Sequence, residues 1–199
     1  MKAANCIAIF NSCIVKYHLK DNVDELLDSQ FKEKSYEYLL YKKNWIDTVQ
    51  WHLEDIIRDP NIKPNKGIEI KRRIDTSNQA RTDLVEQIDD YYIEQFSTIT
   101  PNSTATLNTE SPGWVIDRLS ILCLKIYHMK EQVERKDVDE NHQLKCQKKL
   151  SILLEQEQDL SKSFDELIDN YKKGIKKIKV YRQMKMYNDN SLNPILYKK

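Results

Sequence analysis

Charged and amide side chains occupy helix positions at which the sequence periodicity calls for apolar residues. They do so in three stretches, at about residues 47–58, 78–86 and 117–125. Burying an unpaired charge costs several kcal/mol, so each such residue must find a partner, reach solvent or contact a ligand. The residues that break the apolar pattern, or face those that do, are Asp47, Gln50, Glu54, Asn78, Arg81, Asp117, Arg118 and Lys125.

The basic residues in this set suggest an anion-binding site between helices. The planar guanidinium group of arginine donates two parallel hydrogen bonds to a carboxylate or a phosphate. If Arg81, Arg118 and Lys125 converge, they would hold an anionic group, while the carboxylates would orient these cations or accept hydrogen bonds from ligand hydroxyls. Catalytic roles cannot be assigned from the sequence. The predicted ligand site consists of Asp47, Gln50, Glu54, Asn78, Arg81, Glu110, Asp117, Arg118 and Lys125.

The same side chains could instead form a closed structural network. Arg81 and Arg118 could pair across helices with acidic residues such as Asp117, which would fix the helix register without any ligand. A cavity beside the charges would favour a ligand site, and saturation of every cation by a carboxylate would favour the network. Both interpretations remain open at the level of sequence.

The sequence contains no recognisable metal or cofactor motif. A di-iron site in a helical bundle needs Glu-x-x-His on two helices, and the nearest match is Asp139 three residues before His142. The low glycine content leaves no Gly-rich phosphate-binding loop. We therefore expect no metal and no cofactor, and we interpret His52 and His128 as hydrogen-bonded structural residues. The fourth histidine of the chain is His18.

Three tryptophans, Trp45, Trp51 and Trp114, flank the predicted ligand site. Tryptophan beside polar groups often lines the binding site of a sugar or another ring-shaped ligand, because the indole is flat and amphipathic. Packing in the apolar core is the alternative role for each of them.

The elements that must position these residues are helices. Apolar residues recur at helical spacing, Asp59-Pro60 ends one helix, and Ser111-Pro112 provides an N-cap followed by a proline suited to the first helical position. We predict an all-α fold, an antiparallel bundle of about four long helices with shorter additional helices, in a single domain over residues 1–199. A polar linker covers about residues 97–110, and a short helical piece follows the first helix. The predicted helices cover about residues 4–19, 33–58, 67–96, 112–135, 139–173 and 175–187.

Composition excludes several classes of protein. With 40% hydrophobic and 32% charged residues the chain is too apolar to be disordered, and three glycines with five prolines are too few for a β-sandwich or barrel. No apolar run approaches the roughly 20 residues that span a bilayer, and we expect no signal peptide. The cysteine spacings fit neither a disulfide framework nor a zinc site, which predicts reduced thiols and a cytoplasmic protein. These cysteines are Cys6, Cys13, Cys123 and Cys146.

Charge is distributed unevenly along the chain. Residues 171–199 carry a net charge of +8, in what we predict to be a basic helix and tail from about residue 172, and the remainder carries −7. The two regions could neutralise each other within the fold, or the basic segment could contact an anionic partner such as nucleic acid or a membrane surface. The interleaved tyrosines and methionines look like packing residues, which argues against nucleic acid. A homo-oligomer is compatible with the sequence.

Four segments together resemble a bacterial family of uncharacterised proteins known as domain of unknown function 4254. They are NWIDTVQWHLED at 44–55, RIDTSNQARTD at 73–83, NTESPGWVIDRLSIL at 108–122 and YRQMKMYND at 181–189. The family has no assigned activity. The resemblance implies a bacterial protein, and because some members are encoded near glycosyltransferases for cell-surface glycans, it implies a setting in glycan metabolism.

A second, shorter resemblance is to the first helix of the all-helical chorismate mutases. Arg81 followed by Val85, Ile88 and Asp89 is similar to the helix that helps clamp a dicarboxylate in those enzymes, although the expected downstream spacing of arginine and lysine is absent. Such enzymes act by positioning and charge alone.

Three classes of function follow from these observations. The leading hypothesis is a binding or accessory protein for a small anionic or sugar-like ligand. The alternatives are an enzyme acting on a small anionic or sugar-nucleotide substrate, and a structural or interaction protein whose polar network binds no ligand. Whether the protein is an enzyme is left open.

Overall fold

The computed structural model describes residues 1–186 and 189–198. No β-strand occurs in this described part, which confirms the predicted all-α class. The described residues form five long helices and one short helix. They are α1 (Ala3–His18), α2 (Tyr36–Ile57), α3 (Pro64–Gln95), α4 (Pro112–Glu134), α5 (Glu140–Lys172) and α6 (Pro194–Tyr197).

Three of the long helices begin at side-chain caps that the sequence supplies. The Ser35 hydroxyl accepts a hydrogen bond from the backbone N–H of Tyr38 at the start of α2. Ser111 caps α4 in the same way, with proline at the first helical position, and Asp139 caps α5. Such caps satisfy backbone donors that have no partner within the helix, so the boundaries follow from local chemistry.

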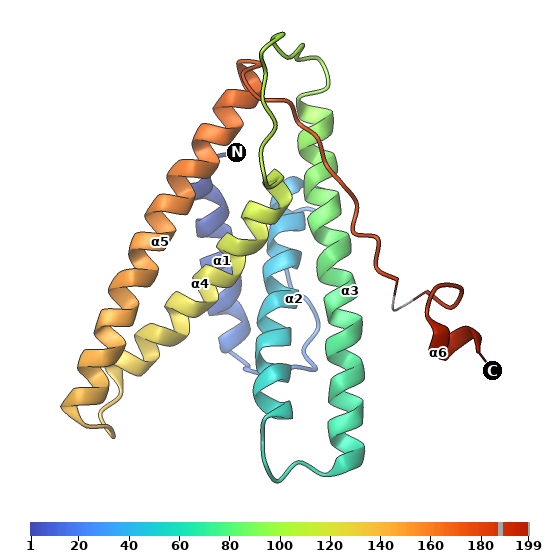
Figure 1. The fold of residues 1–199 in the computed structure, drawn as a ribbon. Coiled ribbons are helices and arrows are strands. Elements are labelled where there is room, and N and C mark those ends of the chain that lie inside the picture. Colours follow the sequence, from blue (N-terminus) through green and yellow to red (C-terminus); the bar gives the residue numbers. More distant parts are fainter. Residues whose placement is uncertain (187–188, 199) are drawn as a thin grey trace.

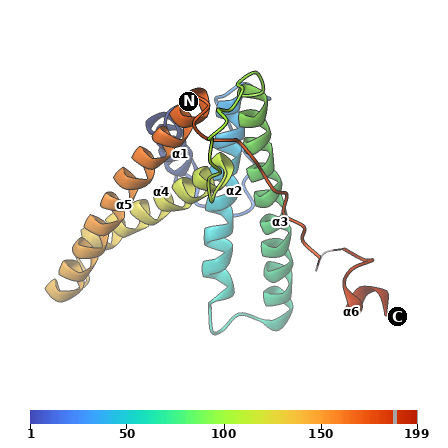
Figure 2. The same ribbon diagram turned by 45° about the horizontal axis from the view of Figure 1, so that its top comes forward.

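Four of the long helices form two antiparallel hairpins, α2–α3 and α4–α5. The two hairpins diverge from each other toward the loops that connect their helices (Figures 1 and 2). Helix α1 contacts α2, α4 and α5. The main apolar core lies where these elements meet, and its members include Phe10, Leu40, Ile116, Leu119 and Phe164. Between α1 and α2 the chain forms turns in place of the predicted short helical piece.

The polar linker between α3 and α4 is fastened to the end of α5. Gly174 takes a left-handed conformation, with φ of +66°, immediately after α5. Its carbonyl accepts a hydrogen bond from the backbone N–H of Asn102, and Thr106 pairs with Lys176 through a single bridge. These hydrogen bonds hold the linker in one conformation between α3 and α4.

The prediction of a basic helix over residues 175–187 is wrong for residues 175–186, which form an extended segment. Tyr187 lies outside the described residues. The segment crosses α3 (Figure 1), where Arg182 pairs with Asp90 and the ammonium of Lys185 donates to the Thr82 hydroxyl at 2.5 Å. Residues 175–186 contain five basic residues and no acid, so a helix here would gain no internal ion pairs. Contact with α3 supplies acidic partners for Arg182, which lies against Glu86 and Asp90.

The C-terminal tail contains little regular structure, and the cysteines form no disulfide bonds. After the two undescribed residues the tail contains turns and the short α6, none of whose residues is buried. All four cysteines are buried and free. None of the helices in the described part is long and apolar enough to cross a membrane.

The buried carboxylate of Asp89 on α3 anchors the first turn of α4. Its Oδ1 accepts a hydrogen bond from the backbone N–H of Gly113 at 2.7 Å, and its Oδ2 accepts one from the Ser111 hydroxyl at 2.6 Å. Burial raises the pKa of Asp89, and these hydrogen bonds act in the opposite direction. The anchor fixes how α4 lies against α3, and hence where the polar residues of the two helices meet.

The close approach of α3 and α4 predicts that Gly113→Ala lowers the free energy of unfolding by about 1–3 kcal/mol. A Cβ atom at this position would lie 2.5 Å from the carbonyl oxygen of Val85 and 2.8 Å from the Asp89 carboxylate. At Gly67, the matched control in α3, the nearest atoms would be 3.8 Å away, so Gly67→Ala should be neutral or stabilising by about 0.4–1 kcal/mol. Urea denaturation measures both, and equal effects would contradict the close contact.

Candidate functional site

The centre of the site is the buried carboxylate of Asp47 on α2. Lys43, one turn earlier on the same helix, pairs with its Oδ2, and both side chains are fully buried. The Ser120 hydroxyl of α4 donates to the same oxygen at 2.5 Å. The Nε of Arg81 on α3 donates to Oδ1 at 2.6 Å. One carboxylate thus connects α2, α3 and α4.

A second carboxylate completes the charge network. The Oδ1 atom of Asp117 on α4 lies 2.8 Å from the Lys43 ammonium and 3.2 Å from Nη2 of Arg81. Two acids and two bases therefore alternate, and their formal charges cancel. Each of the four charged groups contacts two groups of opposite charge. These contacts compensate for the hydration that the groups lose on burial.

The electrostatic balance at Asp117 favours its ionised form. Burial acts to raise the pKa of Asp117, but the neighbouring Lys43 and Arg81 outweigh this effect and hold the pKa below its ordinary value of 3.8. A carboxyl group with a lowered folded-state pKa stabilises the fold above its ordinary pKa. That stabilisation is lost as the pH falls below 3.8 and through the folded-state value.

Amide and hydroxyl groups extend the network along α2. The Asn44 side-chain amide donates to the Ser120 hydroxyl at 2.9 Å, and the Thr48 hydroxyl donates to the backbone carbonyl of Asn44 at 2.8 Å. All three of these residues are fully buried. The polar groups of α2 and α4 thus face each other inside the bundle, in the positions that an apolar pair would normally fill.

A cleft of about 300 Å³ opens beside this network. The guanidinium group of Arg81 reaches its wall, since the side chain is 21% exposed while the Asp47 side chain behind it is fully buried. Larger hollows lie elsewhere, but this cleft has the fixed charges in its wall. Its lining consists of Asp47, Gln50, Trp51, Glu54, Asp55, Arg58, Arg81 and Ile121.

Two further polar pairs shape the cleft. The Gln50 side chain donates from Nε2 to Asn78 Oδ1 at 2.8 Å and accepts from the Ser77 hydroxyl at 2.9 Å, which holds its amide group in one orientation. The Glu54 carboxylate pairs with Nη1 of Arg58 at 2.6 Å. The cleft therefore presents oriented donors and acceptors.

The structure brings most of the predicted site residues together, but not the three cations. Arg118 is largely exposed and pairs with Glu110, and neither residue lines the cleft. Lys125 is exposed and, together with Arg118, lines a separate hollow of about 610 Å³ between α4 and α5. The predicted site residues that lie at the cleft or directly contact its lining are Asp47, Gln50, Glu54, Asn78, Arg81 and Asp117.

Three buried residues behind the cleft were not predicted as part of the site from the sequence, namely Lys43, Asn44 and Ser120. Lys43 and Asn44 follow Leu40 by three and four positions, a spacing that places them on the same buried helix face. Lys43 also precedes Asp47 by four positions, which is the spacing of an ion pair on one helix. Ser120 gave no comparable signal, because a small hydroxyl residue is common in helix interfaces.

A group of histidines lies next to the cleft and could hold a metal ion. Ring nitrogens of His18, His52 and His128 all lie within 4.8 Å of one another. The indole of Trp51, which lines the cleft, stacks on the His128 ring with centroids 5.0 Å apart. The histidines and the cleft therefore share one side chain as a common wall.

Comparison with known families places this chain beside an uncharacterised one. A family model described as protein of unknown function (DUF4254) matches residues 37–180. The match includes α2, α3, α4 and α5 and hence the charge network. No curated protein and no solved structure matches the chain.

The network predicts that Lys43→Met lowers the free energy of unfolding by about 3–5 kcal/mol, because it leaves two carboxylates with a single cationic partner. Lys42→Met is the matched control, since Lys42 is half-buried on the same helix turn and takes no part in the network. We expect its effect to stay below about 1 kcal/mol. Urea denaturation followed by circular dichroism measures both, and similar losses for the two variants would show that the network contributes little.

Proposed function

The chain belongs to the family described as protein of unknown function (DUF4254), and from the geometry of the cleft we propose that it binds a small, hydroxylated, sugar-like ligand. The observation that carries the proposal is the Arg81 guanidinium group, which two carboxylates hold in place at the wall of a cleft beside Trp51. Held in this way, the group is a fixed donor whose orientation is set before a ligand arrives.

The chemistry of the lining suits hydroxyl groups. Gln50, Glu54 and Arg81 offer an amide, a carboxylate and a guanidinium group, so the cleft contains both donors and acceptors. Trp51 adds a flat aromatic ring against which the apolar face of a sugar ring could pack. A volume of about 300 Å³ is at the lower end for small-molecule sites, which limits the ligand to about one sugar ring.

Among the ligand classes expected from the sequence, the neutral hydroxylated class has the stronger support. An anion would need unpaired cations, but Arg81 is paired with Asp47 and Asp117, and Arg58 is paired with Glu54. A sugar hydroxyl needs no net charge from the protein and can donate to a carboxylate while accepting from a guanidinium group.

Binding is the proposed role, rather than catalysis. General acid–base catalysis needs a group that can exchange a proton with the substrate. Asp47 is fully buried and accepts hydrogen bonds from three side chains, and Glu54 is paired with Arg58. An enzyme acting on a small anionic or sugar-nucleotide substrate remains the rival proposal, and it predicts turnover of a ligand that the cleft binds.

The setting that we propose is an accessory role in cell-surface glycan metabolism of a bacterium. The ligand class suits this setting, which the family resemblance first suggested. Four free, buried cysteines suit a reducing compartment such as the cytoplasm.

The proposal predicts that at least one neutral sugar from a panel of hexoses and N-acetylhexosamines raises the melting temperature of the protein and changes the tryptophan fluorescence. In Glu54→Gln the affinity should fall about tenfold, because the cleft loses a charged acceptor. Isothermal titration calorimetry with the best sugar of the panel measures this change.

Glu110→Gln is the matched control. The Glu54 and Glu110 side chains are 37% and 32% exposed, and each pairs with an exposed arginine, but Glu110 lies outside the cleft. We expect Glu110→Gln to bind the sugar as the wild type does. If no sugar in the panel binds, or if both variants lose affinity equally, the assignment of the ligand to this cleft is wrong.

A further inference from the structure

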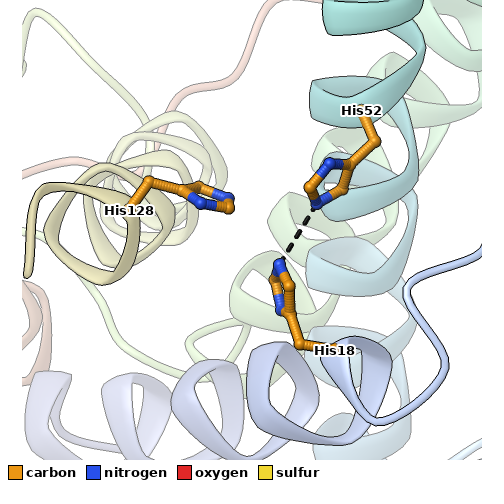
Figure 3. A group of neighbouring side chains, drawn as sticks. All are labelled: His18, His52 and His128. Atoms are coloured by element: carbon orange, nitrogen blue, oxygen red, sulfur yellow. Dashed lines mark hydrogen bonds between the residues drawn. The ribbon is translucent and has the colours of Figure 1, made fainter. Parts of the chain in front are cut away.

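Three histidines from three different helices point toward one another beside the cleft. His18 lies at the end of α1, His52 in α2 and His128 in α4 (Figure 3). The three distances between their ring centroids are 5.2, 5.2 and 5.4 Å, and the rings meet edge to face with interplanar angles of 69°, 69° and 79°. The group is therefore a nearly equilateral triangle of imidazoles.

The spacing of the ring nitrogens is close to that of a metal site. Zinc binds imidazole nitrogens at about 2.0–2.1 Å, so two such ligands at a tetrahedral angle lie about 3.3 Å apart. The Nε2 atoms of His18 and His52 are 3.2 Å apart. All three histidines offer a ring nitrogen within 4.8 Å of the others, so a small closure of the triangle would bring them to ligand distance.

The outer nitrogen of each ring faces an acceptor. His18 Nδ1 lies 2.7 Å from the backbone carbonyl of Ile14, and His128 Nδ1 lies 2.7 Å from the Glu131 carboxylate. His52 Nδ1 lies 3.7 Å from the Asp55 carboxylate. Histidines that bind a metal usually donate their second N–H to a carboxylate or a carbonyl, which fixes the tautomer and directs the lone pair to the ion.

One of the inner nitrogens is buried without a partner. Among the described residues, Nε2 of His128 has no hydrogen-bond partner, and because Nδ1 faces Glu131 it carries the lone pair. Without an ion, His52 can donate its Nε2 proton to His18, but this leaves His128 unsatisfied. A buried polar atom without a partner is costly, and a cation at the centre of the triangle would satisfy all three lone pairs.

Aromatic rings hold each imidazole in its orientation. Tyr127 stacks on His18 at 4.4 Å between centroids, Tyr17 on His52 at 5.2 Å, and Trp51 on His128 at 5.0 Å. Such packing restricts the side-chain rotamers, so the three ligand atoms would be oriented before an ion binds.

An ion would have a path to this site from solvent. The His52 and His128 side chains are 19% and 18% exposed, and the exposed carboxylate of Asp21 lies 3.7 Å from His52 Nε2. His128 also lines a hollow of about 560 Å³ between α2, α4 and α5. A ligand or a water molecule could therefore complete the coordination.

We propose that His18, His52 and His128 bind one divalent transition-metal ion of the zinc class through their Nε2 atoms, with a further coordination position open to solvent. Imidazole nitrogen is a preferred ligand of zinc, and three protein ligands with an open position are typical of catalytic zinc sites rather than closed structural ones. The sequence could not indicate this site, because its three ligands lie far apart along the chain, with the whole of α3 between His52 and His128.

Titration of the full, chelator-treated chain with Zn²⁺ tests the proposal, with Co²⁺ as a spectroscopic probe of the coordination geometry. We expect one equivalent of Zn²⁺ to bind and raise the melting temperature, and Co²⁺ to give visible absorption typical of low coordination number. In His128→Asn the affinity should fall about a hundredfold or more, since removal of an outer partner alone costs about 10- to 100-fold.

His142→Asn is the matched control, because His142 is the one histidine of the chain outside the triangle and lies near Cys146, another residue able to bind zinc. It should bind Zn²⁺ as the wild type does. Glu131→Gln removes the carboxylate that faces Nδ1 of His128, and because the Glu131 side chain is half-exposed, the core is not altered. The affinity of this variant for Zn²⁺ should fall about tenfold.

Failure of the wild type to bind one equivalent would overturn the proposal, as would equal affinities of His128→Asn and His142→Asn. Glu54→Gln should bind Zn²⁺ normally, so the outcome for the metal site and the outcome for the sugar cleft can be read separately.

Discussion

The arrangement of this protein depends on one buried carboxylate. Asp47 is fully buried and accepts hydrogen bonds from Lys43 on its own helix, from Arg81 on α3 and from Ser120 on α4. A carboxylate in this position is tolerable only while its donors stay in place, because an unpaired buried charge costs several kcal/mol. The helices α2, α3 and α4 are therefore held in one register by a requirement of electrostatics rather than by apolar packing alone.

The same requirement creates the surface features from which we infer function. Asp47 and Asp117 hold Arg81 so that its outer part reaches the cleft, and Asp89 fixes the start of α4 against α3. With α2 and α4 held together at the network, His52 and His128 meet His18 from α1 farther along the same helices. The network thus serves as the rigid support for two proposed sites, one for a sugar-like ligand and one for a metal ion, which share Trp51.

Local signals in the sequence predicted the helices, and tertiary contacts determined the rest. Ser111-Pro112 and Asp139 start their helices by capping, which depends on adjacent residues alone. The extended path of residues 175–186 depends on contacts of Arg182 and Lys185 with α3, which no local pattern encodes. Periodicity placed both Arg81 and Arg118 on core-facing positions, but it could not show that Arg118 would face a hollow between α4 and α5. The histidine triangle could not be predicted from the sequence either, because its three residues meet only through the packing of α1, α2 and α4.

The buried network requires that Arg81 and Asp117 stabilise the fold jointly, and a double-mutant cycle measures this coupling. Unfolding free energies of the wild type, Arg81→Met, Asp117→Asn and the double variant would be obtained by urea denaturation. We expect a coupling energy of at least about 1 kcal/mol, within the range found for residues that share a buried ion-pair network. Additive effects within about 0.5 kcal/mol would contradict it, since they would mean that the two side chains stabilise the fold independently.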